Sequence, residues 1–553
     1  MRSTDLISLF MCVCLSCRHS VKLPRSKLID IDLIIPVRKL ASLFVLLVLT
    51  GCDPSPAVTV NGEVLAGKYV EPGGVAAFLG VPFAEPPVGE LRWRAPQSLQ
   101  SGLERRDASE FAAACMQSMR ILDWYRYMAE TFGASADYYA DLKISEDCLY
   151  LNLWTPTLDD NAKLPVMVWI HGGSNRSGWS YENNYRGHVL ARQGVVVVTV
   201  AYRQGVFGFL SHPELSGDEP VANFGLWDLI ASLQWIRKNV ETFGGDPDRV
   251  TLFGESAGGE NILALMFAEQ AAGLFHRGIL QSTAGYGLSM PTLETEQQRG
   301  ADLASALGLS GAETLAPLRL VPADKLLDVY EDTFADYYHS PAIDGQLLTG
   351  STWENIQARK FADHEMIVGS NDHEWFDFIP KGASSDDVVL TASNHPRIGG
   401  DKALAIVAGE TDRRRAIDRL VTADRFVCPS QNTAAHRTAS GGNAWMYFFT
   451  RVREDEAGAS LGAFHGAEYS YVFGVHDAYM TTNETDLELT AAMQKYWINF
   501  AATGNPNGDG VPDWPQFKAS HFEVQELGDS VLTIPAIEPE MCASFEAWNA
   551  AQR

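Results

Sequence analysis

The sequence has fewer basic than acidic residues, and its main body lacks low-complexity tracts and internal repeats. It contains 43 Lys and Arg against 69 Asp and Glu, for a formal net charge of −26 over 553 residues. Proteins that bind nucleic acid usually carry basic patches, so this balance argues against a nucleic-acid partner. With 46% hydrophobic residues, the chain has ordinary globular composition, which excludes the disordered and fibrous classes.

The apolar run near the N-terminus is too short to cross a bilayer. Leu40–Leu49 is preceded by Arg38 and Lys39 and followed by Thr50-Gly51-Cys52. Spanning takes about 20 residues, whereas a basic pair before a short apolar run is typical of a secretory signal peptide. The Leu-Thr-Gly-Cys ending resembles a bacterial lipobox, which implies that Cys52 is lipidated; an ordinary signal peptide ending beside a cysteine is the alternative. We expect an exported chain that is secreted, or held at the periplasmic side of the bacterial envelope only by a lipid anchor.

The signal-like segment does not begin the chain, because residues 1–36 precede it. We interpret Val37 as the translation start, with the upstream stretch an artefact of gene delimitation. The sequence then divides into an upstream extension and signal peptide over 1–51, a linker over 52–57 and one domain over 58–553. No internal linker divides this domain, and no sequence feature specifies an oligomeric state.

Cysteine is scarce in the expected mature chain. After Cys52, only Cys115, Cys148, Cys428 and Cys542 remain. An even number of cysteines in an exported chain indicates two disulfides. A zinc site is the alternative, but no Cys-x-x-Cys or histidine pair has ligand spacing, so we expect no metal.

The body shows short apolar runs bounded by glycine, alternating with helical patterns. "LPVMVWI" (164–170) and "GVVVVTVAYR" (194–203) are continuous and β-branched, which is typical of strands buried on both faces. Helices are expected over 225–245 and 487–506. Further strands are expected at 249–253, 278–282, 365–369 and 445–449. This alternation predicts a large, mostly parallel sheet flanked by helices.

A candidate nucleophile lies between the strand at 249–253 and a following helix. "GESAGG", Gly254 to Gly259, matches the Gly-x-Ser-x-Gly nucleophile elbow, in which a sharp strand-to-helix turn exposes the serine hydroxyl. Ser256 is therefore the predicted nucleophile. A serine needs a histidine base and an orienting carboxylate, in the chain order Ser, acid, His. Position alone does not choose among the histidines that follow.

Several long motifs resemble the type-B carboxylesterase and cholinesterase family. They are "FLGVPFAEPPVGELRWRAP" (78–96), "SEDCLYLNLWTP" (145–156) and "ANFGLWDLIASLQWIRKNVETFGGDPDRVTLFGESAGG" (222–259). The resemblance extends from about Val58 to the C-terminus. It implies an α/β-hydrolase fold with cap or gorge insertions, and a serine carboxylic-ester hydrolase that acts on a small-molecule ester without cofactor.

The family's motifs then select the base and the acid. "GAFHGAEYSYVFG" (462–474) resembles its histidine motif and implies that His465 is the general base. "GSNDHEW" (369–375) resembles its acid motif and implies Glu374. The family's usual glycine after this glutamate is Trp375 here, which keeps Asp372 and Asp377 open as alternatives.

The stretch "HGGSN" resembles the family's His-Gly-Gly-Gly loop, which supplies backbone amides to an oxyanion hole. The resemblance implies amide donors from Gly173, Ser174 and Ala257. Ser174 occupies the position of the third glycine and must adopt its backbone conformation without glycine's freedom. We expect it to narrow the site against bulky alcohol groups.

The resemblance also pairs Cys115 with Cys148 and Cys428 with Cys542. The loop between the first pair is rich in aromatic residues, which either line a gorge or pack within the loop. The position of the cholinesterase tryptophan falls near Tyr138, so choline esters are not predicted. Lipase, lactonase or carbamate hydrolase specificity is one alternative, and a non-catalytic cholinesterase-like binding domain is another.

Overall fold

The computed structural model describes residues 55–551 apart from 71–73, 101–103, 284–289, 312, 336, 359–363 and 519–521. The chain from Ser55 onward forms one compact unit, and its first strand, β1 (Ala57–Val60), begins at the last residue of the expected linker. The expectations for Val37, the signal segment and Cys52 lie outside the described residues. In the described part, no helix is both long and apolar enough to cross a membrane.

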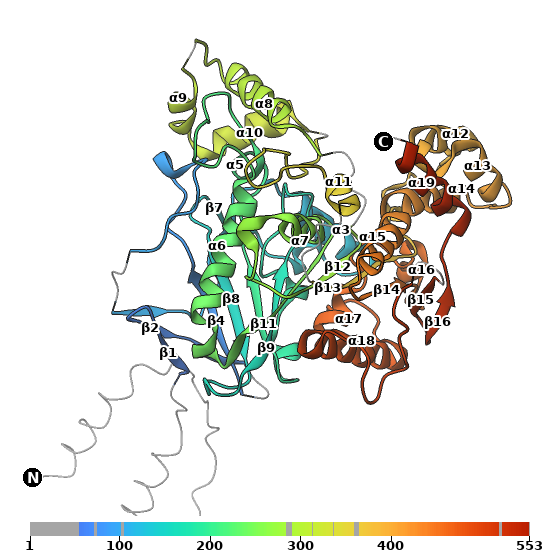
Figure 1. Cartoon of the computed structure of the whole chain (residues 1–553), viewed down its shortest axis with the longest axis horizontal. Helices are drawn as coiled ribbons and strands as arrows, with labels where there is room; N and C mark the ends of the chain where they lie inside the picture. Colours follow the sequence, from blue (N-terminus) through green and yellow to red (C-terminus); the bar gives the residue numbers. More distant parts are fainter. Residues whose placement is uncertain are drawn as a thin grey trace, which may run out of the picture. The chain divides into compact units, whose positions relative to one another are not determined.

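The centre of this unit is a mixed sheet (Figure 1), with eleven strands in the described residues. Neighbouring strands run in the order β16-β15-β14-β13-β12-β11-β9-β10-β8-β4-β3. Those from β10 to β15 in this order are parallel, and the strands beyond them on each side pair antiparallel. The predicted large, mostly parallel sheet is confirmed. The parallel strands are β9 (Leu164–Ile170), β10 (Val196–Val200), β11 (Gly245–Glu255), β12 (Arg277–Gln281), β13 (Glu365–Asn371), β14 (Ala444–Phe449) and β15 (Glu523–Leu527). The others are β3 (Lys68–Val70), β4 (Val75–Pro82), β8 (Tyr150–Thr155) and β16 (Val531–Pro535).

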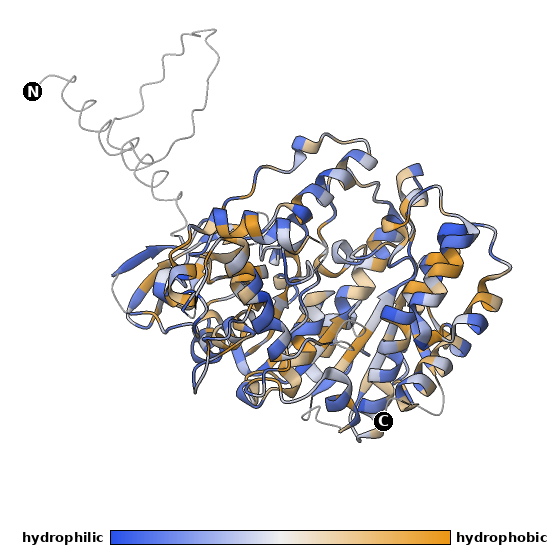
Figure 2. Ribbon diagram, turned by 90° about the horizontal axis from the view of Figure 1, so that it is seen from above, coloured by the Kyte–Doolittle hydropathy of each residue, from blue (hydrophilic) through white to orange (hydrophobic). Residues whose placement is uncertain are grey.

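The continuous apolar strands divide their side chains between two cores. In β9, Val168 and Ile170 enter one cluster, whereas Met167 and Trp169 enter another. This alternation follows from the two-residue repeat of a strand, and it explains why a sheet covered on both faces needs unbroken apolar runs. Figure 2 shows hydrophobic strands inside the molecule and helices with mixed faces around them.

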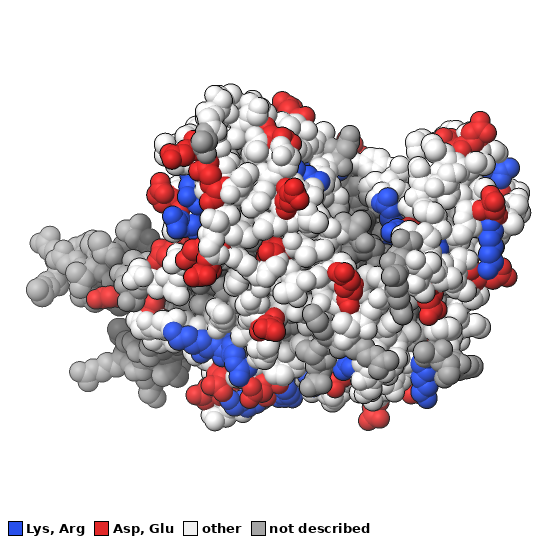
Figure 3. Space-filling model, turned by 45° about the horizontal axis from the view of Figure 1, so that its top comes forward, with Lys and Arg blue, Asp and Glu red and all other residues white. Residues whose placement is uncertain are grey.

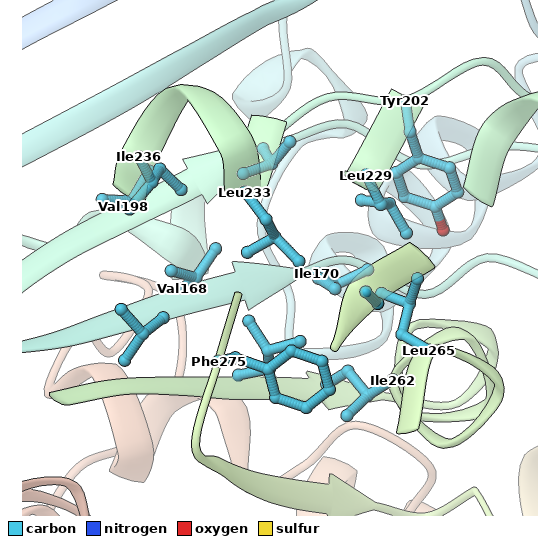
Figure 4. Close-up of a cluster of buried hydrophobic side chains, with 14 of the residues drawn as sticks. Val168, Ile170, Val198, Tyr202, Leu229, Leu233, Ile236, Ile262, Leu265 and Phe275 are labelled. Carbon is cyan, nitrogen blue, oxygen red and sulfur yellow. The ribbon is translucent and has the colours of Figure 1, made fainter. Parts of the chain in front are cut away.

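Helices α6 (Phe224–Asn239) and α7 (Ala257–Phe267) pack on the first of these faces. Figure 4 shows Ile236 of α6 beside Val198 of the sheet and Leu229 of α6 beside Tyr202. Fully burying each such side chain stabilises the fold by roughly 1.5–3 kcal/mol. A 3₁₀ turn, η4 (Val240–Phe243), extends α6, and Gly244 ends it with φ 78°, as its position after the last apolar residue predicts.

The opposite face is covered by α4 (His188–Ala191), α17 (Tyr469–Phe473) and α18 (Glu484–Thr503). The last matches the late helix expected over 487–506, and Gly504 ends it at φ 80°. On the face drawn in Figure 3, basic side chains occur singly or in small groups between acidic ones. On this face the Asp and Glu side chains are therefore mixed with Lys and Arg side chains.

A smaller apolar cluster lies beside the sheet, between the helices that follow β13. It joins α12 (Ser385–Asn394), α13 (Gly400–Val407), α14 (Arg413–Thr422) and α19 (Pro539–Ala551). A disulfide between Cys428 and Cys542 borders this cluster, with an S–S distance of 2.02 Å. A second disulfide joins Cys115 and Cys148 at 2.07 Å. These are the two pairs that the resemblance implied.

Candidate active site

Ser256 lies at the turn between β11 and α7, in a backbone conformation that few residues adopt. Its φ and ψ are 53° and −126°, a strained combination for a residue with a Cβ. The turn is possible because glycines let the chain approach β9. A Cβ on Gly258 would lie 2.0 Å from the Ile170 carbonyl oxygen, and one on Gly254 would lie 2.6 Å from it. The geometry is that of the predicted nucleophile elbow.

Glu374 and His465 meet beyond the carboxyl ends of β13 and β14. Glu374 Oε2 accepts a hydrogen bond from His465 Nδ1 at 2.6 Å, and its Oε1 accepts one from the Asn371 backbone amide at 2.7 Å. The carboxylate is fully buried. Asp372 and Asp377 bond elsewhere. Asp372 pairs with Arg415, and Asp377 accepts a hydrogen bond from the indole of Trp124 in α3 (Arg120–Thr131).

A second carboxylate contacts the other nitrogen of the imidazole. Glu255 Oε1 lies 2.9 Å from His465 Nε2, and Glu255 Oε2 accepts a hydrogen bond from the Tyr469 hydroxyl. Burial lowers the pKa of His465, but the charges of Glu255 and Glu374 outweigh it and hold the pKa well above 6.5. Among the described residues, no hydrogen bond joins Ser256 Oγ to the imidazole, although both side chains line one cavity. Catalytic contacts of this kind often tighten only when substrate is present.

The loop after β9 turns sharply toward Ser256. Gly173 has φ 104°, and a Cβ there would lie 1.8 Å from the Ser177 carbonyl oxygen. Ser174 adopts φ 62° without being glycine, so it occupies the left-handed region that the third family glycine would occupy easily. No described residue accepts a hydrogen bond from the backbone amides of Gly173, Ser174 or Ala257. These amides are free to donate to a ligand.

Polar contacts that the sequence did not predict hold this loop. Asn175 Nδ2 donates to the His339 carbonyl at 2.8 Å, and Asn261 Nδ2 donates to Asn175 Oδ1 at 2.8 Å. The buried Arg176 pairs with Glu331 at 2.6 Å. The sequence around Arg176 did not indicate this ion pair, because its partner Glu331 lies far along the chain.

The loop, Ser256 and His465 line a cavity of about 270 Å³. Six aromatic residues line it together with polar and glycine residues: Trp124, Tyr125, Tyr185, Trp375, Phe378 and Tyr469. The aromatic residues between Cys115 and Cys148 thus divide between the two expected roles. Trp124 and Tyr125 line the cavity, whereas the ring of Tyr139 packs within the loop against those of Tyr125 and Tyr138.

Two further buried glutamates surround this site. Glu182 lines the cavity and accepts hydrogen bonds from the Tyr125 hydroxyl and the Trp179 amide. Glu468 accepts bonds from the Gln281 and Asn371 side chains at 3.0 and 2.7 Å. Burial raises the pKa of each to about 7. Glu468 lies within the His-Gly-Ala-Glu motif, which could have identified it, whereas Glu182 carries no motif.

Comparison with known proteins agrees with this geometry. Residues 54–398 and 405–541 match the model of the carboxylesterase family. The chain is 33% identical over 509 residues to liver carboxylesterase 1 of Oryctolagus cuniculus, covering 84% of this chain and 88% of that protein. It is 30% identical to acetylcholinesterase 1 of Caenorhabditis briggsae, covering 86% and 83% respectively.

Solved structures of esterases have the same fold. A PNB esterase matches with a TM-score of 0.77 and 30% identity, over 89% of this chain and 99% of that one. A carboxylesterase of Geobacillus stearothermophilus matches with a TM-score of 0.75 and 26% identity, over 88% and 99%. The chain therefore belongs to the carboxylesterase family and is a serine carboxylesterase with the α/β-hydrolase fold.

Proposed function

We propose that the chain hydrolyses carboxylic esters through an acyl-enzyme, with Ser256 as nucleophile, His465 as general base and Glu374 as the orienting acid. The observation that carries this proposal is the 2.6 Å bond between His465 Nδ1 and Glu374 Oε2, beside a serine held in a strained elbow. A buried carboxylate on Nδ1 fixes the tautomer that leaves Nε2 able to accept a proton.

In the first half-reaction, Ser256 Oγ attacks the ester carbonyl while its proton passes to His465 Nε2. The imidazole must turn Nε2 from Glu255 toward the adjacent Ser256 for this step. The resulting tetrahedral intermediate collapses, and His465 returns the proton to the leaving alcohol. Water then attacks the acyl-enzyme carbonyl while one of its protons passes to Nε2. The second tetrahedral intermediate collapses with cleavage of the bond to Ser256 Oγ, His465 returns the proton to that oxygen, and the acid is released.

The backbone amides of Gly173, Ser174 and Ala257 are the proposed oxyanion hole. Their lack of acceptors among the described residues supports this role, because donors already aimed at developing charge need no reorganisation. Removing one such donor typically costs about 3 kcal/mol of transition-state stabilisation. The cavity volume of about 270 Å³ favours a small-molecule ester.

We also propose that the enzyme acts outside the cytoplasm, either anchored through a lipid on Cys52 at the periplasmic side of the envelope or secreted. The sequence "LTGC" supports the anchor. The two disulfides support export, because such bonds persist in oxidising compartments.

Labelling with a fluorophosphonate probe tests the nucleophile. The wild-type chain should be labelled and should hydrolyse short p-nitrophenyl esters, and Ser256→Ala should lose both properties. Ser393→Ala, at an exposed serine of α12, is the matched control and should retain both. Undiminished labelling or hydrolysis in Ser256→Ala would refute the assignment.

A further inference from the structure

We infer that Arg415 and Asp418 of α14 are positioning residues that hold the Glu374 turn in line with His465. The inference rests on the proposed triad. It assigns a role in positioning the acid to Arg415 and Asp418, neither of which lines the cavity. It begins from the turn itself, where Trp375 stands in place of the family's usual glycine.

Backbone groups before and after Glu374 are bonded to α14. Asp418 Oδ1 accepts a hydrogen bond from the Trp375 amide at 2.9 Å. On the other side, Arg415 Nη1 donates to the Asp372 carbonyl oxygen at 2.6 Å. The turn is therefore held on each side of the acid, at Asp372 and at Trp375.

Charge joins these contacts into one unit. Arg415 Nη2 lies 2.5 Å from Asp372 Oδ1, and Arg415 Nη1 lies 2.5 Å from Asp418 Oδ2. The Asp418 side chain is fully buried and that of Arg415 is 21% exposed. A buried carboxylate needs a partner, so removing Arg415 leaves Asp418 without its cation. A guanidinium can bond several acceptors in a fixed plane, so removing Asp418 leaves Arg415 paired with Asp372 but frees the Trp375 amide.

The same continuous helical segment also contacts the base. After α14 the helix widens into a π turn, η9 (Ala423–Val427). Phe426, in this turn, has its ring centre 5.4 Å from that of His465 and 6.5 Å from that of Trp375. Such π turns often occur at functional sites. One helical segment thus contacts both the turn that carries Glu374 and the imidazole of His465.

Trp375 fits this arrangement. Its φ is −119°, so the turn has no positive φ there that would require glycine. Its ring packs against Phe378 and beneath the guanidinium of Arg425, at 4.9 Å from ring centre to guanidinium carbon. The hydrogen bonds from α14 thus fix the Glu374 turn without a glycine at position 375.

A matched ion pair on the same helix separates positioning from general stability. Arg419, one turn after Arg415, lies 2.7 Å from Glu538 Oε1 and contacts neither the Glu374 turn nor the cavity. If α14 needed its arginine pairs only to fold, Arg419→Met and Arg415→Met would behave alike.

The experiment compares Asp418→Ala, Asp418→Asn, Arg415→Met, Arg415→Lys and Arg419→Met in the full chain. We expect Asp418→Ala and Arg415→Met to lower kcat by about 10- to 100-fold at little-changed KM, because small misplacements of catalytic groups cost this much. The far-downfield proton resonance of the His465 Nδ1–H bond should weaken or move upfield. Asp418→Asn, which keeps an acceptor for the Trp375 amide, and Arg415→Lys should recover part of kcat. Arg419→Met should keep the wild-type kcat and resonance.

The inference is overturned if Asp418→Ala and Arg415→Met keep kcat within twofold of wild type with an unchanged resonance. It is equally overturned if Arg419→Met loses kcat to the same extent. Should an alanine or methionine variant fail to fold, the near-isosteric Asp418→Asn and Arg415→Lys give the same readouts, and wild-type kcat and resonance in both would refute the inference. Activity in Ser256→Ala would instead refute the proposed triad, so the two failures are distinguishable.

Discussion

Glu255 Oε1 and His465 Nε2 lie 2.9 Å apart, so in the resting enzyme the imidazole sits between two buried carboxylates. Glu374 is bonded to Nδ1 on the other side. Both charges favour the imidazolium, and together they outweigh the effect of burial, which lowers the pKa. The base is therefore protonated to a higher pH than an ordinary histidine, and the resting geometry determines the working pH range.

This relationship predicts how activity depends on pH. Only the neutral imidazole accepts the serine proton, so kcat/KM should fall as pH drops through the raised pKa of His465, at a midpoint above 6.5. Glu255→Gln removes one negative charge beside the imidazolium, which should move this acid limb to lower pH. The measurement is a pH profile of p-nitrophenyl ester hydrolysis. An unmoved acid limb in Glu255→Gln would contradict the prediction.

Glu374→Gln should keep the fold and lose most of kcat. An amide in place of the carboxylate neither stabilises the imidazolium nor fixes its tautomer, a change that costs about 10⁴-fold in a comparable serine hydrolase triad. Asp377→Asn is the control, since Asp377 bonds to Trp124 and Tyr127 rather than to His465. If Asp377→Asn lost more activity than Glu374→Gln, the acid would be misassigned.

Ser174→Gly should improve turnover of esters with bulky alcohol groups more than that of methyl or ethyl esters. The Ser174 side chain lines the cavity and its backbone already has φ 62°, so glycine removes atoms without requiring a new conformation. Steady-state kinetics over a series of alcohol sizes measures the effect. Equal changes for small and large alcohols would show that Ser174 does not restrict the site.

Gly258→Ala should damage the elbow. Its Cβ would lie 2.0 Å from the Ile170 carbonyl oxygen, and relieving such an overlap typically costs about 1–3 kcal/mol of stability. The displaced Ser256 should also lower kcat by about 100-fold. Gly409→Ala is the control because a Cβ there meets no heavy atom within 4 Å. Thermal melts and kinetics of the two variants should diverge, and equal behaviour would refute the role given to Gly258.

Cys52→Ser should release the enzyme from the membrane fraction of a bacterial host that processes lipoproteins. The lipid anchor is the only proposed attachment, so activity in the soluble fraction should rise while total activity is retained. Fractionation followed by an esterase assay measures this. Identical partitioning of the two chains would contradict lipidation at Cys52.

Much of this molecule could be read from the sequence because its signals are local. The apolar run 164–170 is the exact extent of β9, since a strand covered on both faces needs every residue apolar. The glycines of the elbow were recognisable because close backbone approach allows no Cβ. The three proposed triad residues lie in motifs of only a few residues each. The structure places Ser256 and His465 on one cavity, with Glu374 bonded to His465.

Contacts made by distant segments could not be predicted in this way. Glu182 lies in no motif, and its role in the cavity wall depends on Tyr125 of α3. The replacement of glycine by Trp375 raised Asp372 and Asp377 as alternatives. The structure instead shows the turn held by α14, more than forty residues further along the chain. Such partners are fixed by packing, for which the sequence has no local pattern.

The order of the parallel strands also has a consequence for when the enzyme becomes active. Ser256 follows β11, Glu374 follows β13 and His465 follows β14, so the side chains of the proposed triad enter the structure one crossover at a time. A chain that ends between Ser256 and His465 would carry the serine without its base. Because such long-range pairing is slow to form, hydrolysis should appear abruptly and late in biosynthesis, after nearly all strands of the sheet have been made.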